Sequence, residues 1–414
     1  SFMGRGRGFS PNKQQVALLT DLETLPQFLC RPDDVVLVSQ APRTAFLAQL
    51  KEAGLEPPQF EELSKGKIRG ELLKRKIGAL RPWAWSPESI DLLKPLAGNL
   101  SGDPPPMGED WIKRIRPLYS KAWGAELLRE VLHDADAPEW MCAEWQIGQL
   151  AEDSEQAIEL IQSIRKRGHQ RVVAKMLFGV AGANMQRFWE PQLSEAQKKW
   201  LRRTIEVEGG VVIEPWLDRG FDFSFQFDMT PKGLRSVGMI EMINDQRGQY
   251  QASVYRPKFG AGLNADLVQA LNGPRGGRLK DIRTRLGEIM EPKLQKAGFR
   301  GALGVDAFAY REGEQWRIKP VTEINARYTM GRLMIELMRH TASGRTGKME
   351  LVSLPALRKR GHNSFIEYAA ELKDRFPISL AGHPKPRIDQ GALCLNDPEK
   401  AIGCLAVFSV KKPT

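Results

Sequence analysis

The amino-acid sequence predicts an α/β (α+β) protein of more than one lobe, and three features lead to this expectation. Near the N-terminus, the apolar runs Val16–Leu19 and Val35–Val38 indicate strands, and the spacing over Thr44–Gly54 indicates a helix. Over Phe221–Asp228 aromatic and polar residues alternate, as in a half-buried antiparallel strand. The chain of 414 residues is also too long for one ordinary core.

The same patterns predict the remaining elements. In chain order they are helices at Ser120–Leu132 and Ser154–Arg167, a strand at Arg171–Leu177, a turn at Asn244–Gly248, a helix at Leu279–Ala297, and hairpin strands at Leu303–Tyr310 and Trp316–Tyr328. The proline-rich linker Ser101–Pro106 marks a boundary, because consecutive prolines continue neither a helix nor a sheet. We expect a Rossmann-like N-terminal lobe over 1–110, two central parts over 111–210 and 211–345, and a small, less regular C-terminal extension over 346–414.

The net charge of +11 and the pI of about 9.4 raise the hypothesis of a nucleic-acid-binding protein. The basic residues, however, are spread over short runs in separate regions, which is typical of solvated helix faces. These runs are Lys74–Lys76, Lys113–Arg114, Arg165–Arg167 and Arg358–Arg360. Nucleic acid is therefore disfavoured as a partner, and a positive field also suits ATP or acidic metabolites.

The sequence offers no feature of a membrane or secreted protein. No apolar run approaches the ~20 residues that span a bilayer, and the start SFMGRGRGF lacks the apolar centre of a signal peptide. The four cysteines form no CxxC pair, which argues against a zinc site and a disulfide framework. They are Cys30, Cys142, Cys394 and Cys404. We expect a cytoplasmic protein with no membrane partner.

The segment VTEINARYTMG places Glu323, Asn325 and Arg327 at every second position of a predicted strand. Alternate residues of a strand face the same side, so one anion, one amide and one fixed cation share a face. A half-exposed strand with its polar side in water produces the same alternation. The segment alone does not decide between these two interpretations.

The predicted hairpin favours a site over a solvated strand. With its turn near Glu314–Gln315, the hairpin puts Asp306 directly opposite Glu323. Two facing carboxylates repel each other unless a cation lies between them. Together with Asn325 they form a set of oxygen ligands suited to Mg²⁺, with substrate phosphates completing the coordination.

A second unusual position is Lys175, which lies in the middle of an apolar strand. A buried ammonium group must either reach solvent or meet an anion, and reaching solvent is the more frequent outcome for a lone lysine. The following segment Phe178–Asn184 is rich in small residues, whose backbone amides could hold a phosphate. Lysine and loop together favour a nucleotide site, although no GxxxxGK[ST] motif is present.

The stretch VVIEPWLDRGFDF supplies a third candidate. A strand that ends at Glu214 and is interrupted by Pro215 leaves backbone donors and acceptors free beside Trp216 and Leu217, as the edge of an adenine requires. Asp222 follows closely and could bind ribose hydroxyls. A turn between two strands, with Trp216 in the core, explains the same residues equally well.

In their order along the chain, SKAW at Ser120–Trp123, VVAK, VVIEPWL, GVDAF and EINARYTMGR resemble the ATP-grasp superfamily of carboxylate–amine ligases. Within it, EINARYTMGR and the N-terminal lobe look most like the peptide ligases of the pheganomycin type. The resemblance covers Ser120–Arg339 well and the tail weakly. It implies an ATP-grasp fold, with 111–210 as the central subdomain and 211–345 as the subdomain of the metal and substrate site.

The resemblance also implies a role for each motif residue. Lys121 and Lys175 correspond to the two lysines that contact phosphate, Glu214, Pro215, Trp216 and Leu217 to the adenine hinge, and Asp222 to the ribose contact. Asp306, Glu323 and Asn325 correspond to the ligands of Mg²⁺ between the phosphates of ATP. Arg327 corresponds to the residue that faces the transferred phosphate and its acceptor carboxylate.

Two positions depart from the family pattern. Met176 follows Lys175 where proline is common, and the loop after it contains only two glycines. Gly304 stands where some relatives place an arginine near the oxyanion, so that Arg327, Arg300 or Arg332 would have to take that role.

The function expected from the resemblance is a ligase that uses ATP and Mg²⁺ to form an acylphosphate, which an amine then attacks. Its partners would be a small-molecule carboxylate and an amine, such as an amino acid or a peptide, and a homodimer is possible because dimers are the commonest closed assembly. A phosphotransferase that stops at the phosphorylated product is the alternative within enzymes, and a nucleic-acid-binding protein is the alternative outside them.

Overall fold

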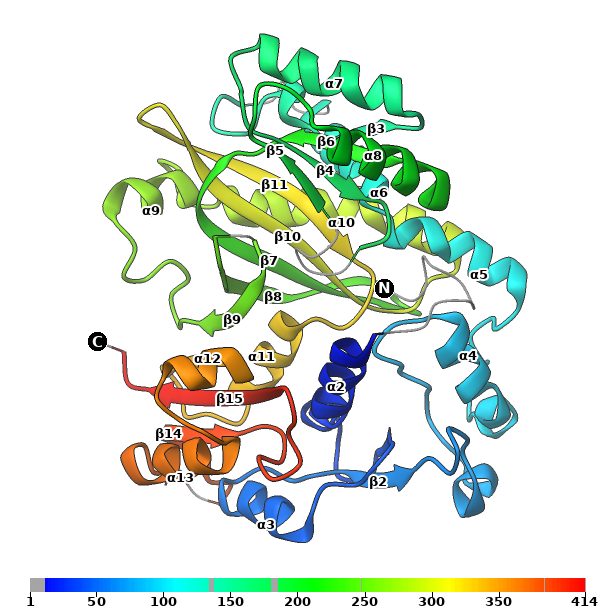
Figure 1. Cartoon of the computed structure of the whole chain (residues 1–414). Helices are drawn as coiled ribbons and strands as arrows, with labels where there is room; N and C mark the ends of the chain where they lie inside the picture. The colour runs from blue at the N-terminus through cyan, green and yellow to red at the C-terminus, as the bar shows by residue number, and fades with distance from the viewer. Residues whose placement is uncertain (1–11, 134–137, 180–184, 247, 383, 414) are drawn as a thin grey trace.

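The computed structural model describes residues 12–133, 138–179, 185–246, 248–382 and 384–413 (Figure 1). The class predicted from the sequence, a mixed α/β protein, is confirmed. No helix in these ranges is both long and apolar enough to cross a lipid bilayer.

The largest sheet has nine strands, and all the neighbouring strands in it are antiparallel. In spatial order they are β11 (Gln315–Asn325), β10 (Gly301–Glu312), β7 (Asp218–Thr230), β8 (Gly233–Asn244), β9 (Tyr250–Tyr255), β12 (Thr346–Ser353), β15 (Cys404–Lys411), β14 (Arg387–Cys394) and β13 (Ser379–Ala381). The C-terminal residues therefore continue the sheet that carries the β10–β11 hairpin. The division of the chain at 110, 210 and 345 stays a prediction.

A second sheet of four antiparallel strands forms a separate layer at the top of Figure 1. Its order is β3 (Gln149–Ala151), β6 (Val211–Pro215), β4 (Val172–Met176) and β5 (Met185–Phe188). Helices α7 (Ser154–Lys166) and α8 (Glu195–Glu208) cover this sheet and share a core with it. Near the N-terminus, β1 (Val35–Val38) and β2 (Gln59–Glu62) pair in parallel around α3 (Thr44–Glu52), as a small β-α-β unit.

The other helices connect and cover these sheets. The α-helices are α2 (Lys13–Leu22), α4 (Pro87–Leu93), α5 (Glu109–Ile115), α6 (Lys121–His133), α9 (Ala265–Asn272), α10 (Arg278–Ala297), α11 (Met330–Met338), α12 (Leu354–Lys359) and α13 (Phe365–Arg375). The short 3-10 helices are η1 (Leu25–Leu29), η2 (Gly70–Lys74), η3 (Lys94–Asn99), η4 (Arg116–Tyr119) and η5 (Glu144–Gln146).

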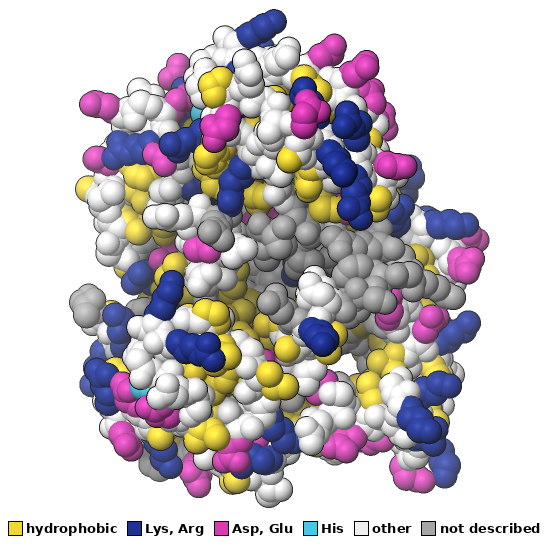
Figure 2. All heavy atoms as spheres, viewed as in Figure 1, with side chains coloured by type: hydrophobic (Ala, Val, Ile, Leu, Met, Phe, Trp, Pro, Cys, Tyr) yellow, Lys and Arg dark blue, Asp and Glu magenta, His cyan; other side chains and the backbone are white. Residues whose placement is uncertain are grey.

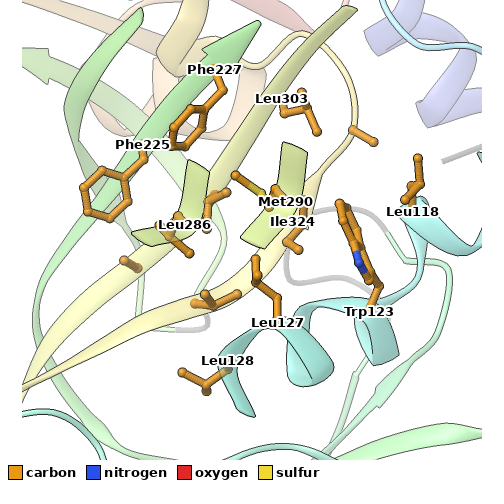
Figure 3. Close-up of a cluster of buried hydrophobic side chains, with 14 of the residues drawn as sticks. Leu118, Trp123, Leu127, Leu128, Phe225, Phe227, Leu286, Met290, Leu303 and Ile324 are labelled. Carbon is orange, nitrogen blue, oxygen red and sulfur yellow. The ribbon is translucent and has the colours of Figure 1, made fainter. Parts of the chain in front are cut away.

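The main core lies where α6 and α10 pack against the nine-stranded sheet (Figure 3). Leu127 of α6 and Leu286 and Met290 of α10 are fully buried. They face apolar side chains of the strands, including Phe225 and Ile324 (Figure 3). This packing fixes α6 against β11, and so places the first residue of that helix beside the polar end of the hairpin.

The N-terminal lobe and the C-terminal strands share a second core. Phe46 and Leu50 of α3 belong to the same buried cluster as Ile388 and Phe408. The ion pair between Arg43 Nε and Asp397 Oδ2, 2.7 Å apart, joins the same two regions. The C-terminal extension is thus packed against the beginning of the chain.

The strand predicted at Val16–Leu19 is wrong, because these residues lie within helix α2. Asn12 caps the helix: its side chain accepts a hydrogen bond from the backbone N–H of Gln15, whose side chain accepts one from the backbone N–H of Asn12. This capping box supplies partners for N–H groups that a helix start leaves free. A run of four apolar residues fits either element, so the cap residues decide.

We expect Leu286→Ala to lower the free energy of unfolding by about 2–5 kcal/mol, because it removes a fully buried side chain from the packed core and leaves a cavity. Denaturant unfolding measures this loss. The matched control, Val207→Ala, concerns a side chain that is 73% exposed and should change stability by less than ~0.5 kcal/mol. Similar losses in the two variants would contradict this description of the core.

Candidate active site

The β10–β11 hairpin pairs Asp306 directly with Glu323, as the sequence predicts. The turn itself lies at Gly313–Glu314, one position earlier than expected, and a regular ladder from that turn would put Asp306 opposite Val321. The register shifts between Asp306 and Phe308, opposite the strand segment that contains Pro320. Proline has no N–H for the ladder, so an irregularity there is expected, and here it restores the carboxylate pair.

Asp306 lies in β10 and is held by hydrogen bonds from the two strands that flank it, β7 and β11. Ser224 Oγ of β7 donates to Asp306 Oδ1 at 2.7 Å, and Asn325 Nδ2 of β11 donates to Asp306 Oδ2 at 2.9 Å. Behind Ser224, the buried Gln226 donates to Ser224 Oγ and accepts from Thr329 Oγ1, each at 2.7 Å. This chain of contacts fixes the direction of the Asp306 carboxylate.

Two cations from different segments meet the polar face of β11. Lys121 Nζ, at the start of α6, lies 2.8 Å from Glu323 Oε1. Arg327 Nη2 donates to Asn325 Oδ1 at 2.6 Å. The structure therefore brings Lys121, Asp306, Glu323, Asn325 and Arg327 together.

The ammonium group of Lys175 meets an anion instead of reaching solvent, which is one of the two outcomes that the sequence predicts for a buried lysine. Its ammonium group pairs with Glu214 Oε1 on the neighbouring strand β6. Glu214 Oε2 lies 3.0 Å from Nζ of a second buried lysine, Lys319 of β11. A small cavity between the two sheets is lined by Lys121, Lys175, Glu214 and Lys319, so both candidate phosphate-binding lysines open onto the same space.

The hinge residues are only partly as expected. Pro215 remains within β6, and the backbone of Trp216 is already bonded: its N–H donates to Arg171 O at 2.8 Å, and its carbonyl lies 3.0 Å from His169 Nε2. At Trp216 the backbone groups are thus not free, and the assignment of this residue to an adenine hinge stays a prediction. For the buried Leu217, no hydrogen bond is found among the residues that the structure describes, so its backbone is the part of the hinge left for a base.

Asp222 lies in β7 opposite Phe308, two positions before Ser224, which pairs with Asp306. Its Oδ1 is 3.4 Å from Arg219 Nη1. Burial raises the pKa of Asp222, and Arg219 only partly opposes this rise. The ribose contact remains a prediction. The small-residue loop is testable only in part, because residues 180–184 lie outside the described residues.

The pKa values of Asp306 and Glu323 are shifted in opposite directions by burial and by the neighbouring charges. Burial, followed by the Glu323 carboxylate, raises the pKa of Asp306 to about 6. Burial also acts against ionised Glu323, but the Lys121 ammonium outweighs it and holds the pKa of Glu323 below its usual value. Adjacent carboxylates with opposite shifts indicate a site short of positive charge on the Asp306 side.

The second cluster shows the complementary pattern. Burial lowers the pKa of Lys175 to about 8, against the Glu214 carboxylate, which raises it. For Glu214, burial is outweighed by Lys175 and Lys319, and its pKa lies well below the usual range. Glu214 is therefore ionised and shared between two cations.

The donor set fits Mg²⁺ and a polyphosphate. Asp306, Glu323 and Asn325 offer the oxygen atoms that a hard cation prefers. Burial first and the Glu323 carboxylate second raise the pKa of Asp306, and a cation would offset both effects. Among the described residues, no three His, Cys, Asp or Glu side chains group as a metal site. A cation here would thus depend on the amide of Asn325 and on ligands from a substrate.

The absence of a side chain at Gly304 has a steric reason. A Cβ atom there would lie 2.8 Å from Thr329 Cγ2 and 3.1 Å from Gln226 Nε2. Arg332 is bonded to both carboxylate oxygens of Asp228, at 2.6 and 3.0 Å, and to Glu336. Of the arginines considered for the oxyanion, Arg327 is the one that contacts the carboxylate cluster, through Asn325.

The sequence prediction missed Ser224, Gln226 and Lys319. Lys319 was visible as a lysine within an apolar strand, which is the property that drew attention to Lys175. Its partner Glu214 lies 105 residues away on another sheet, so no local pattern joins them. Ser224 and Gln226 alternate with aromatic residues of β7, which also fits a solvated strand face.

Comparisons with known proteins give weak but extended similarity. No protein-family model matches the sequence. A [butirosin acyl-carrier protein]–L-glutamate ligase of Niallia circulans is 21% identical over 336 residues, which is 79% of this chain and 68% of the relative. This similarity to a ligase agrees with the resemblance drawn from the motifs.

Solved structures with an overlapping shape include two nucleotide-bound enzymes. The ADP complex of N5-carboxyaminoimidazole synthetase from Staphylococcus aureus is 11% identical, covers 90% of this chain and 86% of its own, and has a TM-score of 0.46. Biotin carboxylase of Campylobacter jejuni is 14% identical, with coverages of 96% and 86% and a TM-score of 0.48.

We expect Asp306→Asn to raise the free energy of unfolding at pH 7.5 by roughly 1–3 kcal/mol, because ionised Asp306 costs stability. With its raised pKa, the folded protein takes up this proton near pH 6, whereas the unfolded chain does so near about pH 4. The cost is thus fully present above pH 6 and is relieved as the pH falls from about 6 to 4. Unfolding measured across this range should show the advantage of the variant disappearing.

The matched control is Asp228→Asn. Burial opposes the charge of Asp228, but hydrogen bonds from Arg332 and Arg235 hold its pKa below the usual value. Ionised Asp228 therefore stabilises the fold, and the variant should be less stable than the parent at pH 7.5. A destabilised Asp306→Asn variant with no pH dependence would show that Asp306 is not strained by its surroundings.

Proposed function

We propose that this chain is an ATP-grasp ligase that uses ATP and Mg²⁺ to activate a carboxylate as an acylphosphate and to join it to an amine, forming an amide or peptide bond. One observation carries the proposal: Asp306, Glu323 and Asn325 converge on the hairpin, and Lys121 contacts Glu323 from a separate helix. Oxygen ligands beside ammonium groups are the surroundings that a magnesium-bound polyphosphate needs.

The nucleotide would lie between the two sheets. In this proposal Leu217 offers its backbone to the base, beside Glu214, Pro215 and Trp216, and Asp222 is near enough in the chain to contact the ribose. Lys121 and Lys175 line the same cavity and would contact the phosphates. Bound Mg²⁺ would offset the charge of the phosphates beside Asp306, Glu323 and Asn325.

Arg327 would orient the reacting groups. An oxygen of the substrate carboxylate attacks the γ-phosphorus of ATP, the bond to the β,γ-bridging oxygen breaks, and ADP leaves. The amine then attacks the acyl carbon, and the tetrahedral intermediate releases inorganic phosphate and a proton as the amide forms. A guanidinium group suits both stages, because it stays charged and binds phosphate and carboxylate oxygens in pairs.

This chemistry requires no covalent nucleophile from the protein. Phosphoryl transfer depends on positioning and on charge neutralisation, which lysine, arginine and the metal supply. Burial raises the pKa of all four cysteines to about 12, so none is a ready thiolate. The residues present therefore match a ligase that works through an acylphosphate.

The substrates we propose are an amino acid or peptide carboxylate and an amine. The Niallia circulans relative is named for an acyl-carrier protein and L-glutamate. Glutamate is accordingly the first carboxylate to examine, with free amino acids and carrier-bound amines as acceptors. The homodimer remains a prediction.

The distribution of basic side chains on the surface gives no support to nucleic-acid binding on the face shown in Figure 2. Figure 2 shows lysine and arginine side chains scattered over this face among acidic and apolar ones. A nucleic-acid interface would require a continuous basic band along the path of the phosphates.

We expect purified protein, incubated with ATP, Mg²⁺ and a panel of amino acids and short peptides, to release ADP and phosphate only with the correct pair of substrates. Mass spectrometry should detect the new amide in an amount equal to the ADP. Omission of the amine should suppress the amide. ADP release without any substrate dependence, or a stable phosphorylated product in the presence of amine, would contradict the ligase.

We expect Glu323→Gln to lower kcat by about a hundredfold or more, because it removes a charge from the cation site and from the Lys121 pair. Steady-state assays of ADP release measure this loss. Glu314→Gln is the matched control, because Glu314 lies exposed in the turn of the same hairpin and should retain parental turnover. Equal activity of the two variants would remove Glu323 from the site.

A further inference from the structure

Lys319 forms a buried cluster with Glu214 and Lys175. The side chains of the three residues are between 2% and 7% exposed. One carboxylate is shared by two ammonium groups, so the cluster carries one positive charge in excess. A buried charge without a partner is costly, and an anion entering the adjoining cavity would offset it.

The two lysines are not equivalent. Lys319 Nζ donates to the carbonyl of Gln146 at 2.9 Å as well as contacting Glu214 Oε2 at 3.0 Å. Gln146 is itself fixed, since its side chain accepts from Tyr310 and donates to Glu312. Lys319 is therefore anchored at two points.

Lys175 has a single anchor. Within the described part of the chain, its ammonium group has one acceptor, Glu214. The pKa of Lys175 is lowered, and burial is the largest cause. Of the two cations, Lys175 is the one able to turn toward a ligand without breaking a second contact.

If Lys175 turns toward a phosphate, Glu214 loses one partner. Without Lys319, Glu214 would then be a buried, unpaired carboxylate. The cost of that state would keep Lys175 in its ion pair with Glu214. With Lys319 in place, Glu214 keeps a cation in either position of Lys175. The second lysine thus removes the electrostatic penalty for releasing the first.

We infer that Lys319 is a positioning residue that keeps Glu214 paired and so frees Lys175 to bind the phosphates of a nucleotide. This inference rests on the proposed function and assigns a role to a residue outside the family motifs. The same logic holds for the other lysine of the cavity. Lys121 is paired with Glu323, and if Lys121 turned to a phosphate, that carboxylate would be left to hold a metal cation together with Asp306 and Asn325.

The test measures nucleotide affinity rather than turnover. The probe is the β,γ-imido analogue of ATP with Mg²⁺, and its dissociation constant is determined by isothermal titration calorimetry. We expect Lys319→Met to raise this constant roughly tenfold to a hundredfold, because Glu214 then retains Lys175. Lys293→Met is the matched control, since Lys293 of α10 also bridges two glutamates, Glu126 and Glu130 of α6, but none of these three residues lines the cavity.

A double-mutant cycle separates positioning from direct contact. In the Glu214→Gln background the amide needs no cation, so Lys319→Met should change the dissociation constant by less than about threefold. An equal loss in both backgrounds would mean that Lys319 itself contacts the nucleotide, and would overturn the inference. Parental affinity in Lys319→Met, with only reduced stability, would also overturn it.

The same set of proteins also covers two other cases: a Lys319→Met variant that does not fold, and a parent protein that binds no nucleotide. If Lys319→Met does not fold, Glu214→Gln and the double variant are compared: equal affinities of these two proteins support the inference, and weaker binding by the double variant refutes it. A parent protein that binds no nucleotide refutes both the inference and the proposed function. Binding by the parent with an unaffected Lys319→Met variant refutes the inference alone.

Discussion

The structure of the site depends on the pairing of Asp306 with Glu323 across the β10–β11 hairpin. Two carboxylates at adjacent positions are unfavourable unless positive charge compensates them. The surroundings supply part of it, through Lys121 at Glu323 and hydrogen bonds from Ser224 and Asn325 at Asp306. The raised pKa of Asp306 shows that this compensation is incomplete. The hairpin is therefore held in an arrangement that a divalent cation would complete.

The edge of the large sheet explains why the compensating groups come from distant segments. β11 is an edge strand, and an open edge must be covered. Isolated bridges join Met141 to Ile318 and Ala84 to Arg327, and α6 crosses the same strand. Coverage of the edge thus brings the N-terminal lobe, α6 and the hairpin to one place, which is where Lys121 and Arg327 act.

The carboxylate pair could be predicted from sequence because alternation and a short turn restrict the register of a hairpin. The prediction was correct even though its turn was one position late, because the irregularity at Pro320 compensates for the difference. The strand at Val16–Leu19 was wrong because four apolar residues do not define a period, and the deciding contact is the cap between Asn12 and Gln15.

Other parts of the site could not be predicted from local pattern. Lys319 and Glu214 come from strands of two different sheets and meet only through the tertiary fold. The bonded backbone of Trp216 depends on Arg171 and His169 from a preceding segment. The buried cluster that contains both Phe46 and Phe408 likewise joins the two ends of the chain. Contacts of this kind follow from tertiary packing, which leaves no fixed spacing in the sequence.

Both charge clusters obey one physical rule. Each lysine of the cavity is paired with a carboxylate, which makes its burial tolerable, and each carboxylate would have another cation within reach if its lysine turned to a ligand. For Glu323 the other cation would be the metal, and for Glu214 it is Lys319. Because the two replacements differ in origin, the proposed release of Lys121 would be coupled to metal binding, whereas that of Lys175 would respond to the nucleotide alone. A phosphate chain that arrives with its metal would satisfy both conditions at once, whereas either component by itself would satisfy one.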